Sequence, residues 1–336
     1  MLKTPIKIAT LLIALSSLML TGCQTTSVHA EKTDATDNLI TAYDYQLFNA
    51  KWQPITHHEL TQNLLKADVI FMGEFHGNHA AHLLQTSLLS ALYRQHPQLM
   101  LSMEMFNRNH QTTLNDYLNG NIGEETLIDQ TSAWSNYKAS YRPLVEFARQ
   151  NQLPVIAANA SADIIRCIGA QGQSYLSKLN AKEQQWLAQK PFVEITHYRS
   201  EFFKLMGQAK HITNSKKLDN IYSAQIARDN TMAESINTAL KQHPNHKVIH
   251  LNGRFHSENH LGTAGALKRL NPQLNIEVIT PVYVDDVSTI SAEQNRSDNY
   301  YYVVKPQPVD YVQEQNRINA YKAMFEKSRQ KSKACK

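Results

Sequence analysis

Histidine and glutamate side chains occur together at three points of this sequence, each directly after a short apolar run. These residues are Glu74 and His76 after residues 69–72, Glu104 after residues 99–103, and His256 after residues 248–251. Imidazole and carboxylate groups ligate divalent metals and transfer protons near neutral pH. The set therefore suggests two kinds of chemistry, a divalent-metal site or a catalytic acid–base group.

Both histidines belong to a repeated Gly-x-x-His pattern. Gly73 stands three positions before His76, and Gly253 stands three positions before His256. A glycine at a strand end lets the backbone approach closely, and the histidine then points toward the same edge. A histidine after a single strand is more often structural than a ligand. The argument for a site therefore rests on the coincidence of three strand ends.

The apolar runs alternate with amphipathic helices. Helical spacing is seen, for example, in Leu84, Leu88 and Leu92. This alternation predicts an α/β fold with a mainly parallel β-sheet and helices on both faces. Such folds bind ligands at the carboxyl ends of their strands, where the histidines and glutamates lie. Strands are expected at residues 69–72, 99–103, 153–158, 248–251, 276–279 and 300–304.

Residues 160–219 interrupt the alternation. They contain no convincing strand, and aromatic residues such as Tyr198, Phe202 and Phe203 crowd the segment. We interpret it as a helical lid insertion over the sheet. Ordinary connecting helices are the alternative.

The first 22 residues have the pattern of a secretory signal peptide. Lys3 and Lys7 precede the apolar run Ile8–Leu20, which is too short to span a bilayer. The segment Leu20-Thr21-Gly22-Cys23 resembles a bacterial lipobox, which implies cleavage before Cys23 and lipidation of that residue. Gln24 then implies delivery to the outer membrane. The expected location is the cell envelope, as an outer-membrane lipoprotein.

Composition and charge exclude several classes of protein. The 336-residue chain has a net charge of +5, and removal of residues 1–22 leaves +3. Residues 313–336 alone supply +5, so the rest of the mature chain is slightly acidic, which predicts no nucleic-acid partner. No G-x-G-x-x-G, P-loop or G-x-S-x-G motif occurs. Three cysteines do not form a disulfide scaffold, and Cys167 and Cys335 are expected to be unpaired.

Five longer motifs surround these residues. They are Gly73-Glu74-x-His76-x-Asn78 with His82 and Gln85; Glu104-Met105-Phe106 with Gln111; Tyr141-Arg142-Pro143; Gln225, Asp229, Thr231, Met232 and Ala233; and Gly253-x-x-His256 with Leu261-Gly262. Together they resemble the motifs of the ChaN-like haem-binding uptake lipoproteins, a family that shares a superfamily with the Tiki and erythromycin-esterase-like proteins. The resemblance spans about residues 65–270 in the family's order. The insertion at 165–215 matches no family motif, and Gly-Arg-Phe-His stands where many relatives have Gly-x-Gly-His.

The resemblance implies a non-enzymatic lipoprotein that binds haem for iron uptake and reaches the membrane through its lipid anchor. It also implies a homodimer, because in this family a tyrosine ligates the iron while a partner subunit's histidine and lysine hold the propionates. Tyr198 is the preferred ligand, since His197, Lys204 and His211 flank it; core packing of Tyr198 is the alternative. The expected haem-binding residues are Tyr198, His197, Lys204, Tyr141, Arg142 and His82.

A metal-dependent hydrolase, related to the protease and esterase members of the superfamily, is the alternative function. In that case a divalent metal binds to, or acid–base catalysis is performed by, four residues: Glu74, His76, Glu104 and His256. The expected domain organisation is a signal peptide (1–22), a tether (23–40), a ChaN-like α/β domain (41–310) and a basic C-terminal helix or tail (311–336).

Overall fold

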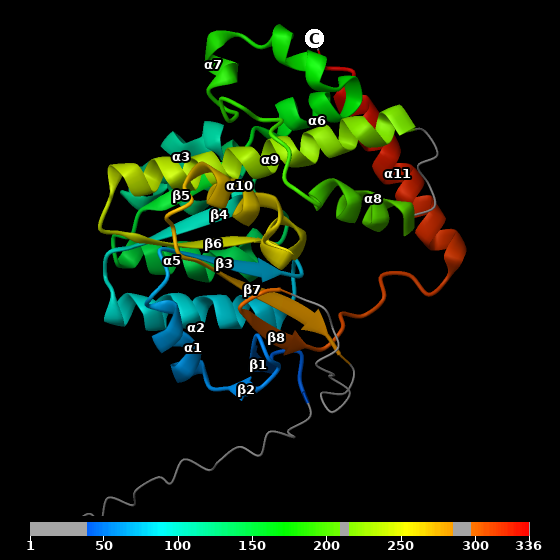
Figure 1. Cartoon of the computed structure of the whole chain (residues 1–336). Helices are drawn as coiled ribbons and strands as arrows, with labels where there is room; N and C mark the ends of the chain where they lie inside the picture. Colours follow the sequence, from blue (N-terminus) through cyan, green and yellow to red (C-terminus); the bar gives the residue numbers. More distant parts are fainter. Residues whose placement is uncertain (1–38, 209–214, 285–296, 336) are drawn as a thin grey trace, which may run out of the picture. The chain divides into compact units, whose positions relative to one another are not determined.

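One mixed β-sheet organises the computed structural model, which describes residues 39–208, 215–284 and 297–335 (Figure 1). The strand order is β2-β1-β8-β7-β3-β6-β4-β5. Neighbouring strands from β8 to β5 pair in parallel, whereas β1 pairs antiparallel with β8 and with β2. The predicted, mainly parallel α/β sheet is confirmed. The strands are β1 (Tyr45–Asn49), β2 (Pro54–Ile55), β3 (Val69–Glu74), β4 (Leu99–Asn107), β5 (Val155–Asn159), β6 (Lys247–Gly253), β7 (Ile276–Tyr283) and β8 (Tyr300–Val304).

Helices cover both faces of the sheet, as predicted (Figure 1). Short 3-10 turns follow β4 and β6, and a π-helical turn, Tyr137–Tyr141, precedes α5. The helices are α1 (His57–Leu64), α2 (His79–Gln95), α3 (Gln111–Leu118), α4 (Glu124–Thr131), α5 (Arg142–Gln150), α6 (Ala162–Gln171), α7 (Ala181–Gln184), α8 (Tyr198–Gln208), α9 (Ser215–Gln242), α10 (Gly262–Leu270) and α11 (Glu314–Ser332).

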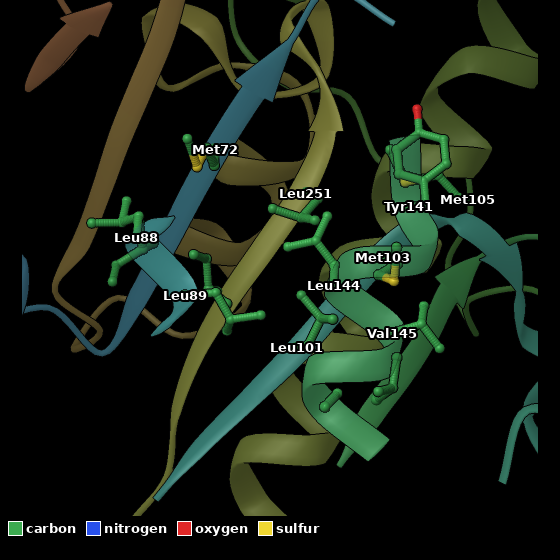
Figure 2. Close-up of a cluster of buried hydrophobic side chains, with 14 of the residues drawn as sticks. Met72, Leu88, Leu89, Leu101, Met103, Met105, Tyr141, Leu144, Val145 and Leu251 are labelled. Carbon is green, nitrogen blue, oxygen red and sulfur yellow. The ribbon is translucent and has the colours of Figure 1, made fainter. Parts of the chain in front are cut away.

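Leucines dominate the core on the face covered by α2 and α5. Leu88 and Leu89 of α2 and Leu144 of α5 pack in one buried cluster with Leu101 of β4 and Leu251 of β6 (Figure 2). Each of these side chains is fully buried. Full burial of a leucine contributes about 1.5–3 kcal/mol relative to an exposed one. This cluster fixes β4 and β6 side by side, and with them the strand ends that carry the site.

The opposite face packs against α9 and α10. Phe71, Val248 and Val278 point to this side because successive strand residues alternate between the two faces. They share a buried cluster with Ile226 of α9 and Leu267 of α10. The long helix α9 thereby runs along this face, with its residues Gln225 and Asp229 beside His256.

The six strands expected from the sequence are all present, most of them extended at the carboxyl end. The sequence analysis missed β1 and β2. In β1 the neighbouring residues Leu47 and Phe48 are both buried, in clusters on opposite sides of the sheet. That arrangement leaves no alternation of apolar and polar residues to mark the strand.

The segment 160–219 contains α6, α7, α8 and the start of α9, and its described part has no strand. Ile164, Ile168 and Leu187 form a separate buried cluster with Ala224 and Ala227 of α9. The insertion therefore has an apolar core of its own against α9. Its role as a lid stays a prediction.

A disulfide joins Cys167 of α6 to Cys335, which lies just after α11. The expectation that these cysteines are unpaired is wrong, because α11 runs back toward α6 and brings the C-terminal end to it (Figure 1). Tyr321 and Phe325 of α11 remain 41% and 45% exposed. The basic C-terminal helix is thus present, but it is held by a covalent bond more than by burial of apolar side chains.

Residues 1–38 lie outside the described ranges. The signal peptide, the lipidated Cys23 and nearly all of the tether therefore remain expectations from the sequence. Within residues 39–208, 215–284 and 297–335, no helix combines the length and apolar character needed to cross a membrane.

Candidate functional site

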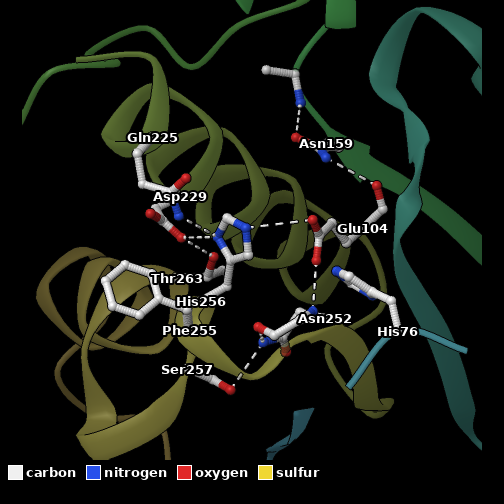
Figure 3. A network of polar contacts seen from close by, with 12 residues as sticks. His76, Glu104, Asn159, Gln225, Asp229, Asn252, Phe255, His256, Ser257 and Thr263 are labelled. Atoms are coloured by element: carbon white, nitrogen blue, oxygen red, sulfur yellow. Dashed lines mark hydrogen bonds and ion pairs between the residues drawn. The ribbon is translucent and has the colours of Figure 1, made fainter. Parts of the chain in front are cut away.

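The carboxyl ends of β3, β4 and β6 bring the predicted histidines and glutamates together (Figure 3). β6 lies between β3 and β4, so residues that follow these strands meet at one edge of the sheet. Helix α9 adds Asp229, which faces His256. We call Glu74, His76, Glu104, Asp229 and His256 the histidine–carboxylate cluster.

His256 is held between two carboxylates (Figure 3). Its Nδ1 lies 2.7 Å from Oδ1 of Asp229, and its Nε2 lies 3.4 Å from Oε1 of Glu104. Burial alone would lower the pKa of His256, but the charges of Glu104 and Asp229 outweigh it and raise the pKa to about 10. The imidazole is therefore a cation at neutral pH, and both of its nitrogens donate.

Both carboxylates around His256 are buried, and each accepts a further hydrogen bond. Thr263 donates its hydroxyl to Oδ1 of Asp229 at 2.8 Å, and the amide of Gly253 donates to Oε2 of Glu104 at 2.7 Å. Burial raises the pKa of Glu104, but the charge of His256 and its hydrogen bond hold that pKa well below the ordinary value. Glu104 is therefore ionised at neutral pH and pairs with a charged imidazolium.

His76 forms the other half of the cluster with Glu74. The fully buried carboxylate of Glu74 accepts from the Tyr141 hydroxyl at 2.6 Å, from Nε2 of Gln85 at 2.6 Å and from Nδ1 of His76 at 2.8 Å. Burial lowers the pKa of His76, but the hydrogen bond to Glu74 and the nearby carboxylate charges raise it overall. Because Nδ1 is engaged, Nε2 is the ring nitrogen left for a ligand.

Solvent reaches His76 more than any other member of the cluster. Its side chain is 45% exposed, compared with 10% for His256 and 6% for Glu104. Its Nε2 donates to and accepts from no residue that the structure describes. Trp134 stands edge-on to the imidazole, with ring centroids 4.9 Å apart.

The lack of a side chain at Gly253, the first residue of the second Gly-x-x-His motif, leaves room for His76. A Cβ atom at this position would lie 2.8 Å from Nε2 of His76, closer than such atoms approach in real structures. The expectation that glycine permits a close approach at the strand end is therefore confirmed, although the approaching group is the other motif's histidine.

Two of the expected haem-binding residues border the cluster without reaching solvent. His82 and Tyr141 are buried, and their rings meet edge-on at 5.0 Å. Nε2 of His82 accepts from the amide of Gly77, so its Nδ1 donates to Gln85. Arg142 lies elsewhere and makes two hydrogen bonds to Glu124.

Tyr198, the preferred iron ligand, is packed in the core. It is 0% exposed, stacks on Phe255 at 5.1 Å and accepts a hydrogen bond from Gln225 at 2.9 Å. Burial raises its pKa well above the ordinary value, so the hydroxyl stays protonated. Tyr198 is therefore packed as the alternative describes, and its role as an iron ligand stays a prediction. Both flanking residues are exposed: His197 directly precedes α8, and Lys204 lies within it.

Three other tyrosines, in the π-helical turn before α5 and in α9, do not offer a free hydroxyl at the surface either. Tyr137, Tyr141 and Tyr222 are 2%, 0% and 1% exposed. His211, which helped to select Tyr198, lies outside the described residues. Exposure therefore points to the histidine–carboxylate cluster rather than to these tyrosines.

The sequence analysis gave no chemical role to Asp229. It noted the residue only as part of a family motif, although Gln225 and Asp229 stand four apart and share a helix face. Both contact Nδ1 of His256, Gln225 at 3.3 Å and Asp229 at 2.7 Å. Within the described ranges, no group of three or more His, Cys, Asp or Glu side chains is placed to hold a metal ion. The divalent-metal hypothesis therefore gains no support from the geometry.

Comparisons with known proteins agree with this fold. The chain has 19% identity to ChaN of Campylobacter jejuni, whose solved structure concerns cofacial haem binding, with a TM-score of 0.61 over 78% of this chain and 98% of that one. An erythromycin esterase in its open conformation shares 14% identity over 82% of this chain and 87% of its own, with a TM-score of 0.42. No curated protein matches the chain in sequence.

A family model described as "Haem-binding uptake, Tiki superfamily, ChaN" matches residues 60–267, more than half of the chain. The match covers β3, β4, β5, β6 and α9, and with them every member of the histidine–carboxylate cluster. This chain therefore belongs to the ChaN haem-binding uptake family of the Tiki superfamily.

Proposed function

We propose that this chain binds haem at the histidine–carboxylate cluster and serves in haem uptake. Membership of a haem-binding uptake family supports haem as the ligand. The observation that carries the choice of site is the imidazole of His76, which is 45% exposed and oriented by the buried Glu74.

The residues around His76 suit a haem group. Histidine is a common axial ligand of haem iron, and a carboxylate on its other nitrogen fixes the tautomer and raises its basicity. Glu74 fills that position, and Trp134 provides an aromatic surface beside the imidazole. Bound haem would supply the iron that the uptake process delivers.

The buried half of the cluster sets the charge around the ligand. His256, as a cation, lies between the carboxyl groups of Glu104 and Asp229 and offsets the negative charge of the ionised Glu104. Glu104 is also bound to the backbone of Gly253, so it is not free to compete for iron. His76 is therefore left as the member that contacts the ligand.

A hemin titration of the purified chain tests this function. We expect one saturable binding event per chain with a shift of the Soret band, and an affinity at least tenfold lower in His76→Ala. His79→Ala is the matched control, because His79 is exposed and stacks on Tyr43 instead of touching the cluster. Absence of a saturable shift in the wild-type protein would refute the proposal.

The cellular setting is part of the proposal. We infer from the lipobox that the chain is an outer-membrane lipoprotein anchored through Cys23. Cys23→Ser would then move the protein from the membrane fraction to the soluble fraction of the cell envelope. The family resemblance further suggests a homodimer, which sedimentation with and without hemin would detect.

A hydrolase is the second candidate, favoured by one observation. The pairs Glu74–His76 and Asp229–His256 flank Gly253, with Glu104 between the two histidines. Two histidine–carboxylate pairs at one sheet edge could supply an acid and a base. Hydrolysis of model esters or peptides that is lost in Glu104→Gln would support this candidate, and no activity with or without divalent metals would reject it.

A further inference from the structure

A closed ring of hydrogen bonds links the side chain of His76 to the backbone next to it. Nδ1 of His76 lies 2.8 Å from Oε1 of Glu74, and Nε2 of Gln85 donates to Oε2 of Glu74 at 2.6 Å. Oε1 of Gln85 lies 2.9 Å from Nδ1 of His82, and the amide of Gly77 donates to Nε2 of His82 at 3.2 Å. Because Gly77 follows His76 in the chain, the ring begins and ends at the same turn.

The backbone amide in this ring fixes the direction of every other bond. An amide N–H can only donate, so Nε2 of His82 accepts, and Nδ1 of His82 carries the proton that it donates to Gln85. Gln85 must then present its own N–H to Glu74, whose other oxygen accepts from Nδ1 of His76. Nε2 of a neutral His76 ring therefore carries the lone pair that an iron ligand needs.

The side chains that connect the two ends of the ring are buried. Glu74 is 2% exposed, His82 6% and Gln85 0%, so a bond lost among them would leave a buried polar group without a partner, which is costly. At the turn, Gly77 has a φ of +79°, in the left-handed region that favours glycine, and its amide is the group that the ring binds. The ring therefore holds both the imidazole of His76 and the backbone beside it.

We propose that His82 is a positioning residue, which orients His76 toward the ligand without contacting the ligand itself. His82 binds the turn through Nε2 and the Gln85–Glu74 pair through Nδ1, so it joins the two connections that hold His76. This role rests on the proposed function, in which His76 contacts haem iron, and deepens it by naming the residue that orients the imidazole. The buried position of His82 is compatible with such an indirect role.

The imidazole of His76 reports on the ring before any haem is bound. In NMR spectra of the ligand-free chain with nitrogen-labelled histidines, we expect one sharp set of His76 signals for the wild type, with Nδ1 protonated when the ring is neutral. In His82→Ala these signals should broaden or shift toward those of a free histidine, because the turn and the Gln85–Glu74 pair are no longer joined.

Hemin affinity in a double-mutant cycle tests whether His82 acts through His76. We expect His82→Ala to bind hemin about 10- to 100-fold more weakly than the wild type, the usual cost of removing a group that holds a metal ligand. In a His76→Ala background the same substitution should have no further effect, since the residue that it orients is gone. His57→Ala is the matched control, because His57 lies beside α2, with Nε2 3.3 Å from the hydroxyl of Ser87, and takes no part in the ring.

Two conservative variants test each connection separately and control for misfolding of His82→Ala. His82→Asn keeps a donor near the position of Nδ1 for Gln85, and His82→Gln keeps an acceptor near the position of Nε2 for the amide of Gly77. Each should recover about 2- to 10-fold of the affinity lost in His82→Ala, the range of one neutral hydrogen bond.

The outcomes separate the role of His82 from the proposed function. Equal hemin affinity in His82→Ala and the wild type would overturn the positioning role and leave haem binding in place. So would an equal loss of affinity with and without the imidazole of His76, or identical His76 signals in the two NMR spectra. If the wild-type chain binds no hemin, the proposed function fails and the role of His82 toward haem fails with it.

Discussion

Replacement of Asp229 by asparagine should lower the pKa of His256 and weaken the fold at neutral pH. The asparagine keeps an oxygen that accepts from His256 and Thr263, but it has no negative charge. The two hydrogen bonds to Asp229 Oδ1 are 2.7 Å and 2.8 Å long, so the geometry can be kept. The substitution therefore isolates the effect of the charge.

The size of the effect follows from the titration of His256. Its pKa is about 10, compared with an ordinary value of 6.5. That difference corresponds to roughly 5 kcal/mol between the protonation states, at ~1.4 kcal/mol for each pH unit. Because Glu104 and Asp229 both raise this pKa, we expect Asp229→Asn to remove about half of the shift, or ~2–3 kcal/mol.

The direction of each pKa shift defines the pH range in which the pair stabilises the fold. A histidine with a raised pKa in the folded state contributes stability that is complete below pH 6.5 and is lost as the pH rises through 10. Glu104 has a lowered pKa, so its contribution is present above its ordinary pKa of 4.5 and is lost as the pH falls. The pair therefore stabilises the fold most between about pH 4.5 and 6.5.

Two measurements check the prediction. NMR of isotopically labelled histidines should show His256 titrating near pH 10 in the wild type and about two units lower in Asp229→Asn. Urea unfolding at pH 6 and pH 9.5 should show a smaller loss of stability with pH in the variant. His250 is an internal reference, since burial lowers its pKa to about 3 and it should not titrate in this range. A wild-type His256 that titrates near its ordinary value would refute the reasoning.

Three further substitutions test other parts of the structure. Cys335→Ser should free α11 and raise its rate of trypsin cleavage at least tenfold, and an unchanged cleavage rate would show that packing alone holds the helix. Gly253→Ala should displace His76, because the new Cβ would lie 2.8 Å from Nε2, and hemin affinity should fall at least tenfold; equal affinity in the two proteins would contradict this contact. Tyr141→Phe should lower the free energy of unfolding by about 1–3 kcal/mol in urea denaturation, because it removes a donor from the buried Glu74, and a neutral result would count against that role.

Local sequence patterns were sufficient to predict the parallel strands of the sheet and the strand ends that carry the candidate site. Buried parallel strands are nearly continuous apolar runs, so their ends could be located from composition. Polar residues at the ends of β3, β4 and β6 then had to meet, because parallel strands share one carboxyl edge. Glu74, His76, Glu104 and His256 were found in this way.

Contacts between distant parts of the chain were beyond the reach of sequence patterns. The Cys167–Cys335 disulfide depends on where α11 runs, which no local pattern specifies. Tyr198 was preferred as a ligand from its basic and aromatic neighbours, yet these features are equally those of a buried aromatic cluster.

The absorption spectrum of the ferric hemin complex tests the central claim most directly, when it is recorded for the wild type, His76→Ala and Tyr198→Phe. If haem binds at the histidine–carboxylate cluster, the wild type and Tyr198→Phe will give the same saturable Soret band, and His76→Ala will shift or lose it. A spectrum that is unchanged by His76→Ala but abolished by Tyr198→Phe would contradict the account.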